Sequence, residues 1–227
     1  MSFYIRKQKP RLKQKYIDQQ NILKRTSLNL ACTNNTDYKL TVSISSSPSI
    51  TSIDLQYSHV KDVEIIALAS SSLPLTSLNI DGTKVTDVGV ISLASSALPL
   101  TSLNVGCVRV TDAGLLALAS SALPLTSLDL CNAGVTDTGI SALASCALPL
   151  TSLNLEWTMV TDAGFLSLAS STSLQQISTK VTAVTPSALE KYQALKKDQL
   201  YRHMVDMTEL RFIPIVLLDI ILGYAVK

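Results

Sequence analysis

Cysteine and histidine side chains, which can act as nucleophiles, acid–base groups or soft-metal ligands, are few in this chain and lie far apart. They comprise four cysteines and two histidines: Cys32, Cys107, Cys131, Cys146, His59 and His203. A cysteine nucleophile needs an adjacent base, yet 48 residues separate His59 from Cys107, and no Ser–His–Asp constellation is assembled either. The residue types therefore predict a protein that is not an enzyme.

The spacing of the cysteines also bears on metals and on location. No pair has the C-x-x-C spacing of zinc sites and redox motifs, and two histidines are too few to complete a zinc cluster. The N-terminal sequence MSFYIRKQKP is basic, and no apolar core of a signal peptide follows it. We therefore expect no metal, no cofactor, free thiols and a cytoplasmic location.

Composition bounds the kind of core and the distribution of charge. Apolar residues make up 47% of the 227 residues and aromatic ones only 5%, so the core must consist of Leu, Ile, Val and Ala. Residues 1–25 carry eight basic and one acidic side chain, residues 26–179 four and eleven, and the remainder seven and five. The net charge of +2 thus conceals an acidic middle between two basic ends.

The elements that must position these side chains come from an internal repeat. The motif LTSLNI and its variants recur every 25 residues, beginning at Arg25, Ile50, Leu75, Leu100, Leu125 and Leu150. A shortened copy, TSLQQISTKVT, begins at Thr172 and lacks the ALPL segment. Six full units and one short unit therefore cover residues 25–185.

Each unit is predicted to form a strand, a turn and a helix. Leu78 and Ile80 alternate with polar residues, which is the period of a half-buried strand. Val90 and Leu93 follow at helical spacing, and the Thr-Asp pair at 86–87 stands where a helix start needs a side-chain oxygen. Because one unit cannot bury its own apolar face, the units must stack around a continuous core.

The repeated string LxxLxLxxTxVTDxGLxxLA resembles the leucine-rich-repeat family, in particular its bacterial and cysteine-containing variants, and residues 80–87 (IDGTKVTD) match it most closely. The resemblance implies an α/β solenoid, a horseshoe with a parallel sheet on the concave side, helices on the convex side and helical caps at both ends. It also implies a binding scaffold, because such repeats serve many partners. Val108 and Ala133 stand where the family has Asn, Cys or Thr, so we expect their turns to lack a side-chain hydrogen bond.

Helical caps are expected over residues 1–24 and 186–227, on either side of the repeats at 25–185. Residues 9–24 fit a basic amphipathic helix, for which contact with an anionic membrane or a nucleic acid is the alternative. No nucleic-acid motif accompanies the charge, so we expect a cap and no nucleic-acid partner. The apolar run at 212–226 is too short to span a membrane and includes Asp219, so we expect no membrane span.

Two further resemblances concern function. Residues 212–224, FIPIVLLDIILGY, resemble the opening of an F-box, in which a proline begins a short apolar helix. Leucine-rich repeats joined to an F-box select substrates for ubiquitin ligases, and this is the alternative function. Near-identical repeats with basic ends also resemble the leucine-rich-repeat effectors of intracellular bacterial pathogens, which implies inhibition or sequestration of an enzyme, with the host cytoplasm as the location after secretion.

Because the repeats align with one another, constant positions indicate scaffold and variable positions indicate surface that is free to bind. A Ser column and an Asn/Asp column are nearly invariant, and three columns just beyond them vary. The first variable column holds Ala31, Gln56, Asp81, Gly106, Cys131 and Glu156. The second holds Cys32, Tyr57, Gly82, Cys107, Asn132 and Trp157, and the third holds Asn34, His59, Lys84, Arg109, Gly134 and Met159.

From these columns we predict a surface that contacts another protein. Its residues are Tyr57, His59, Asp81, Lys84, Arg109, Cys131, Asn132, Glu156, Trp157 and Met159. Trp157 is the only tryptophan of the chain, and exposed Trp and Tyr beside charges are typical of interface hot spots. Acidic side chains on the same face favour a partner with a basic or mixed surface. Paired carboxylates such as Asp54 and Asp81 could serve acid–base catalysis, but a ladder that recurs in most repeats is better explained by the scaffold.

Overall fold

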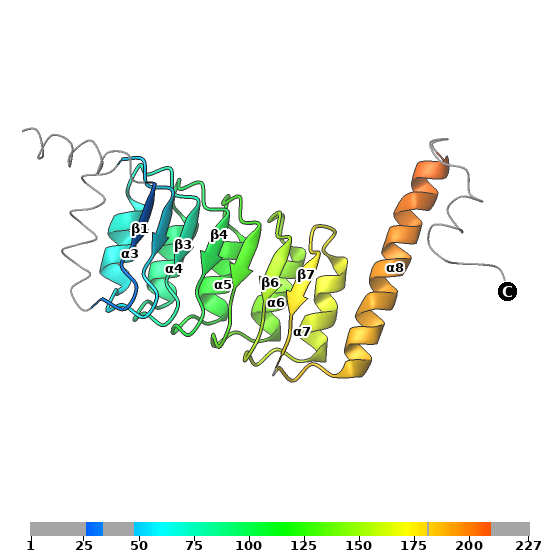
Figure 1. The fold of residues 1–227 in the computed structure, drawn as a ribbon. Coiled ribbons are helices and arrows are strands. Elements are labelled where there is room, and N and C mark those ends of the chain that lie inside the picture. The colour runs from blue at the N-terminus through cyan, green and yellow to red at the C-terminus, as the bar shows by residue number, and fades with distance from the viewer. Residues whose placement is uncertain (1–25, 34–47, 181, 210–227) are drawn as a thin grey trace, which may run out of the picture.

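A computed structural model describes residues 26–33, 48–180 and 182–209, and it shows strands and helices alternating along one row (Figure 1). Seven strands form a single parallel sheet in chain order. They are β1 Ser27–Asn29, β2 Ser52–Asp54, β3 Ser77–Asn79, β4 Ser102–Asn104, β5 Ser127–Asp129, β6 Ser152–Asn154 and β7 Gln176–Ser178. Ser27 pairs with Ser52 and the 25-residue register continues to β6, whereas Ser152 pairs with Gln176 because the last unit is shorter.

Helices line the convex side of the sheet, behind the strands in Figure 1. They are α3 Asp62–Ala69, α4 Asp87–Ala94, α5 Asp112–Ala119, α6 Asp137–Ser145 and α7 Asp162–Ser167, which continues into the 3-10 helix η1 Leu168–Ser170. A longer helix, α8 Pro186–Glu209, lies at the C-terminal end of the row. The expected α/β solenoid is confirmed.

One aliphatic core runs between the sheet and the helices. In the β3–α4 unit, Leu78 and Ile80 point inward from the strand and Val90 and Leu93 from the helix, each at most 1% exposed. The alternation and the helical spacing seen in the sequence therefore both face the same core. Each fully buried side chain of this kind contributes about 1.5–3 kcal/mol of transfer free energy, so the stacked layers supply the main stabilisation.

A carboxylate clamp links each helix to the next. Asp87 Oδ1 accepts hydrogen bonds from the backbone N–H of Thr111 at 2.8 Å and of Gly114 at 3.0 Å, and Asp87 Oδ2 accepts one from Thr111 Oγ1 at 2.7 Å. A Cβ on Gly114 would lie 2.6 Å from Asp87 Oδ1. The VTDxG segment at the start of α4, α5, α6 and α7 is thus the joint between units. Its Asp accepts hydrogen bonds from the following unit, its Thr donates to the Asp of the preceding unit, and its Gly leaves room for that Asp.

The residues that form the clamp differ at α3 and at α8, the first and last helices among the described residues. At α3, Lys61 and Glu64 replace the usual Thr and Gly, and Glu64 Oε2 instead accepts from Lys61 N at 2.8 Å. At the other end, Asp162 still binds Thr185 N at 2.7 Å and Thr185 Oγ1 at 2.8 Å. Pro186 then stands where the earlier units have Asp, so the first turn of α8 has no carboxylate that could extend the clamp.

The slot after the strand that family members fill with Asn, Cys or Thr behaves as the sequence predicts. Thr83 is buried, and its Oγ1 donates to Ile80 O at 2.7 Å. Val108 and Ala133 are also buried, and no side-chain hydrogen bond closes their turns. Ser58 occupies the same slot at 3% exposure, and among the described residues its hydroxyl has no hydrogen-bond partner.

Helix α8 covers part of the last repeat. Ala188 is buried at 4% exposure, and the rings of Phe165 and Tyr192 are 4.7 Å apart between centroids. Residues 1–24, expected to be the N-terminal cap, and the F-box-like residues 212–224 lie outside the described residues. Within the described ranges, no helix combines the length and the apolar character needed to cross a membrane.

Candidate functional site

The second variable column has one unusual backbone conformation in all six units. Its φ angles are 56° at Cys32, 52° at Tyr57, 63° at Gly82, 50° at Cys107, 55° at Asn132 and 60° at Trp157. In the described chain, positive φ angles occur at these residues and at no others. The left-handed region suits Gly and Asn but costs other residues roughly 1–2 kcal/mol. We call this set the left-handed column.

The nearly invariant Asn/Asp column holds that turn in place. Asn79 Oδ1 accepts from the backbone N–H of Asp81 at 3.1 Å, and the same bond recurs in every full unit. The chain then enters the left-handed residue, whose N–H bonds to the next unit; Tyr57 N, for example, donates to Asp81 O at 2.8 Å. Short polar side chains that bond two residues ahead are typical turn formers. This column is therefore scaffold, as its constancy indicates.

Two large aromatic side chains of the left-handed column are open to solvent. Tyr57 is 55% exposed and Trp157 58%, and Met159 beside Trp157 is 61% exposed. The Tyr57 ring lies over Gly82, because a Cβ built on Gly82 would come within 2.2 Å of Tyr57 Cδ1. Four strand spacings of ~4.8 Å place the two aromatic residues about 20 Å apart along the row.

A row of carboxylates lies beside the left-handed column on the concave face, which we call the acid row. Its members are Asp54, Asp81, Asp129 and Glu156. Asp81 is 8% exposed and its Oδ2 accepts from Gln56 Nε2 at 2.7 Å, while Glu156 accepts from the Ser178 hydroxyl. Asp81 is therefore largely withdrawn from the surface, whereas Glu156 remains half-exposed.

A second row, on the outer side of the left-handed column, is basic. It consists of His59, Lys84 and Arg109, all of them exposed. The backbone fixes their spacing, because Lys84 N donates to Val60 O at 2.9 Å and Arg109 N to Val85 O at 3.3 Å. Within the described chain, no ion pair joins this basic row to the acid row. Of the charged groups in the two rows, Lys84 and Arg109 lie most open to solvent, and Glu156 is half-exposed.

The thiols near this surface are poor candidates for covalent chemistry. Partial withdrawal from water raises the pKa of the Cys107 and Cys131 thiols above the usual range, although the Cys107 residue as a whole is exposed, and the carboxylate of Asp81 raises the pKa of Cys107 further. The Asn132 amide donates to Cys107 Sγ at 3.7 Å and opposes this shift. A thiol that stays protonated near neutral pH is a weak nucleophile, and among the described residues no hydrogen bond links His59 to either thiol.

Other features of the chain fit a scaffold as well. Cys146 takes the place of a helix-capping serine, because its Sγ donates to Leu143 O at 2.9 Å as Ser121 Oγ donates to Leu118 O. In the described ranges, no group of three or more His, Cys, Asp or Glu side chains is arranged to hold a metal ion.

The residues predicted from sequence lie after every strand from β2 to β6: Tyr57 and His59 after β2, Asp81 and Lys84 after β3, Arg109 after β4, Cys131 and Asn132 after β5, and Glu156, Trp157 and Met159 after β6. The carboxylate of Asp81, followed by Cys107, raises the pKa of the Tyr57 phenol. The predicted set omits Cys107, although it is exposed and stands in the same column as Tyr57 and Trp157. Membership of that column was the signal that could have found it.

Comparison with known families agrees with this geometry. A leucine-rich-repeat family matches residues 71–94, 98–119 and 123–144, three consecutive stretches that contain β3 to β5. The chain is a leucine-rich-repeat protein. No curated protein matches it. Leucine-rich repeats suggest a protein-interaction module. Here the strand ends and the turns after them carry the left-handed column and both charged rows.

Proposed function

We propose that this leucine-rich-repeat protein binds another protein through the left-handed column and the two charged rows beside it. The observation that carries the proposal is the conformation of Tyr57 and Trp157. Gly82 and Asn132 complete the same turn with residues that suit it, so the scaffold does not require an aromatic side chain there. A large exposed side chain that strains its own backbone is explained by a contact outside the chain.

The arrangement of charge indicates what the partner presents. The basic row lies near Tyr57, whereas Trp157 and Met159 lie beside the half-exposed Glu156. A partner that fits has a mixed surface, with acidic groups opposite the basic row, basic groups opposite the acid row and an apolar pocket for Trp157. Complementary rows of this kind speed encounter and fix the orientation of binding.

We further propose that binding sequesters or inhibits the partner, and that it takes place in the cytoplasm. A non-catalytic scaffold with one preformed face acts on a target by occupying it, and the resemblance to bacterial effectors supports an enzyme as that target, in the host cytoplasm after secretion. The alternative is a substrate adaptor of a ubiquitin ligase, which the F-box-like sequence at 212–224 supports.

Quantitative capture from an extract of the cells that contain the protein tests the proposal. Wild-type protein is compared with Trp157→Asn, which removes the aromatic side chain but keeps a residue that the column accepts at 132. Val88→Thr, at a 56% exposed site on the convex helix α4, is the matched control. We expect a protein that is captured by wild type and Val88→Thr and lost with Trp157→Asn. A set of captured proteins unchanged by Trp157→Asn would overturn the proposed surface.

A further inference from the structure

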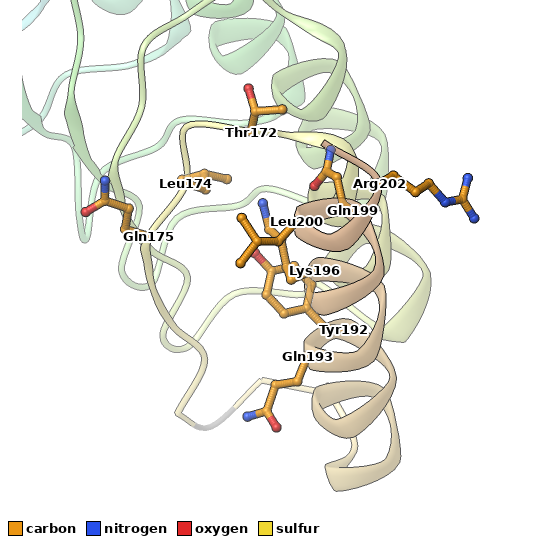
Figure 2. Close-up of a pocket in the computed structure, with 9 residues that line it drawn as sticks. All are labelled: Thr172, Leu174, Gln175, Tyr192, Gln193, Lys196, Gln199, Leu200 and Arg202. Carbon is orange, nitrogen blue, oxygen red and sulfur yellow. The ribbon is translucent and has the colours of Figure 1, made fainter. Parts of the chain in front are cut away.

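A groove lies between α8 and the loop that precedes β7, apart from the left-handed column. Its volume is about 1060 Å³, which is at the upper end of the range for sites that hold a drug-sized ligand. In Figure 2, Tyr192, Lys196 and Leu200 project from α8 toward the loop that holds Leu174, whereas Arg202 points away. The lining is mixed: Leu174, Leu200 and the Tyr192 ring supply apolar surface among polar side chains that include three glutamines, and the Lys196 amine faces inward.

The groove lies where the solenoid stops. In the interior of the row, the following unit covers the core residues of each strand, but the last unit is followed by α8 instead. Ala188 and Tyr192 of α8 cover part of that layer, and Leu200, farther along, is still 50% exposed. A solenoid needs its terminal core covered, and the exposed Leu200 marks apolar surface that α8 and the last unit leave uncovered beside the groove.

We propose that the groove binds the apolar segment at residues 212–224 of the same chain, with residues 215–222 against Tyr192 and Leu200. The segment lies outside the described residues, so the proposal rests on its sequence and on its tether. Residues 215–222, IVLLDIIL, hold seven aliphatic side chains and one charge, Asp219. These aliphatic side chains form apolar surface that must itself be buried, and the nearby groove has apolar side chains against which they can pack.

The chain that links the groove to residue 215 is long enough for the apolar segment to return to the groove. Gln199, which lines the groove, lies ten residues before the end of α8 at Glu209, or about 15 Å along a helix. Residues 210–214 can span roughly 17 Å when extended, which brings residue 215 back to the groove. An attached segment is present at an effective concentration in the millimolar range, so it competes favourably with free partners.

The charge of the groove also matches that of the segment. Lys196 is the amine that lines the groove and is only half-exposed, and it donates one hydrogen bond to the carbonyl of Ser171. Burial lowers the pKa of Lys196, which indicates an amine partly withdrawn from water. An ammonium group has three donors, and the single carboxylate of the segment, Asp219, would accept from those that remain.

Photo-cross-linking in the full chain tests this inference. The variant Leu200→p-benzoylphenylalanine places a cross-linker at the groove, and Ala194→p-benzoylphenylalanine places one at an exposed site of α8 that does not line it. We expect a cross-link from position 200 to the peptide at 212–227 within one chain, independent of protein concentration and at least tenfold stronger than from position 194. Adding Leu218→Asp should reduce it at least fivefold.

Two outcomes would overturn the inference. Cross-links from position 200 that join two chains, and that fade on dilution, would show that a second copy fills the groove. Absence of the tail peptide among the products, or capture of a different protein such as a ligase subunit by the tail, would show that residues 212–224 serve another site. Neither outcome affects the left-handed column, because the groove and that column share no residue.

Discussion

The Tyr57 ring covers the backbone of Gly82, with its Cδ1 2.2 Å from the position that a Cβ would take there. Gly82 is the one glycine in the left-handed column, and its φ is 63°. Because Gly82 has no side chain, it adopts the left-handed conformation without steric strain. The Tyr57 ring can therefore also lie directly against the Gly82 backbone. The orientation of Tyr57 depends on its neighbour in the next unit.

Gly82→Ala should displace the Tyr57 ring and weaken partner binding. The substitution introduces a left-handed alanine, at a cost of about 1 kcal/mol, and a clash with the ring that only rotation of Tyr57 relieves. Val88→Thr, at an exposed site on the convex helix α4, is the control for binding. Urea denaturation should show a loss of stability for Gly82→Ala that leaves the chain folded, while partner affinity should fall for Gly82→Ala and stay at the wild-type value for Val88→Thr. A Gly82→Ala affinity equal to that of wild type would contradict the role assigned to the ring.

Asp112→Ala should destabilise the chain by about 3 kcal/mol, because hydrogen bonds to a charged acceptor contribute roughly 1.5–3 kcal/mol each. Asp112 accepts from Thr136 N at 2.8 Å, from Thr136 Oγ1 at 2.6 Å and from Gly139 N at 3.2 Å. Asp198→Ala removes a carboxylate whose partner, Arg202, is exposed, and should cost less than about 0.5 kcal/mol. Urea denaturation gives the free energy of unfolding of each variant. Equal values for Asp112→Ala and Asp198→Ala would show that the clamp contributes nothing to stability.

Ser58→Thr should stabilise the chain by about 1 kcal/mol, the usual net contribution of a buried hydrogen bond. The Ser58 hydroxyl is buried without a partner among the described residues, whereas Thr83 in the same slot donates to Ile80 O at 2.7 Å. The reverse change, Thr83→Ser, should lower the free energy of unfolding by a similar amount. Thermal denaturation of the two variants checks the sign, and a loss of stability in Ser58→Thr would show that the slot at 58 cannot accept the extra methyl group.

The Cys107 thiol should react slowly with iodoacetamide at pH 8 and faster as the pH rises above 9. Burial, and then the Asp81 carboxylate, raise its pKa, so less thiolate is present at a given pH than in a free thiol. Asp81→Asn removes the carboxylate that raises the pKa of Cys107, so it should modestly increase the rate at which Cys107 reacts with iodoacetamide. Peptide-level mass spectrometry measures the rate at this one cysteine. A rate at pH 8 above that of glutathione would indicate an activated thiol and reopen a catalytic role.

The sequence alone predicts the solenoid well, for a physical reason. Each unit repeats its apolar positions 25 residues on, so that periodicity determines the strand, the helix and the way in which units stack. The constancy of the Asn/Asp column identifies scaffold, although the hydrogen bond that explains it, from Asn79 Oδ1 to Asp81 N, is visible only in the structure.

Two features of the site could not be read from sequence. The left-handed conformation of Tyr57 and Trp157 is set by the turn and by pairing with the next unit, and neither residue type favours it. Asp81 stands in a variable column and looks available, yet Gln56 of the preceding unit binds it and buries it. The conformation of the two aromatic residues and the burial of Asp81 both depend on atoms 23 to 25 residues away in the chain, which local sequence patterns do not report.

The most direct test of the proposed function is the partner affinity of Trp157→Asn measured together with its thermal stability. The account predicts a loss of about 2 kcal/mol in binding free energy, or roughly a 30-fold weaker affinity. It also predicts an unchanged or higher melting temperature, since Asn suits a φ of 60° better than Trp does. Unchanged affinity, or weaker binding that merely follows a lower melting temperature, would contradict the claim that Trp157 is kept for a partner.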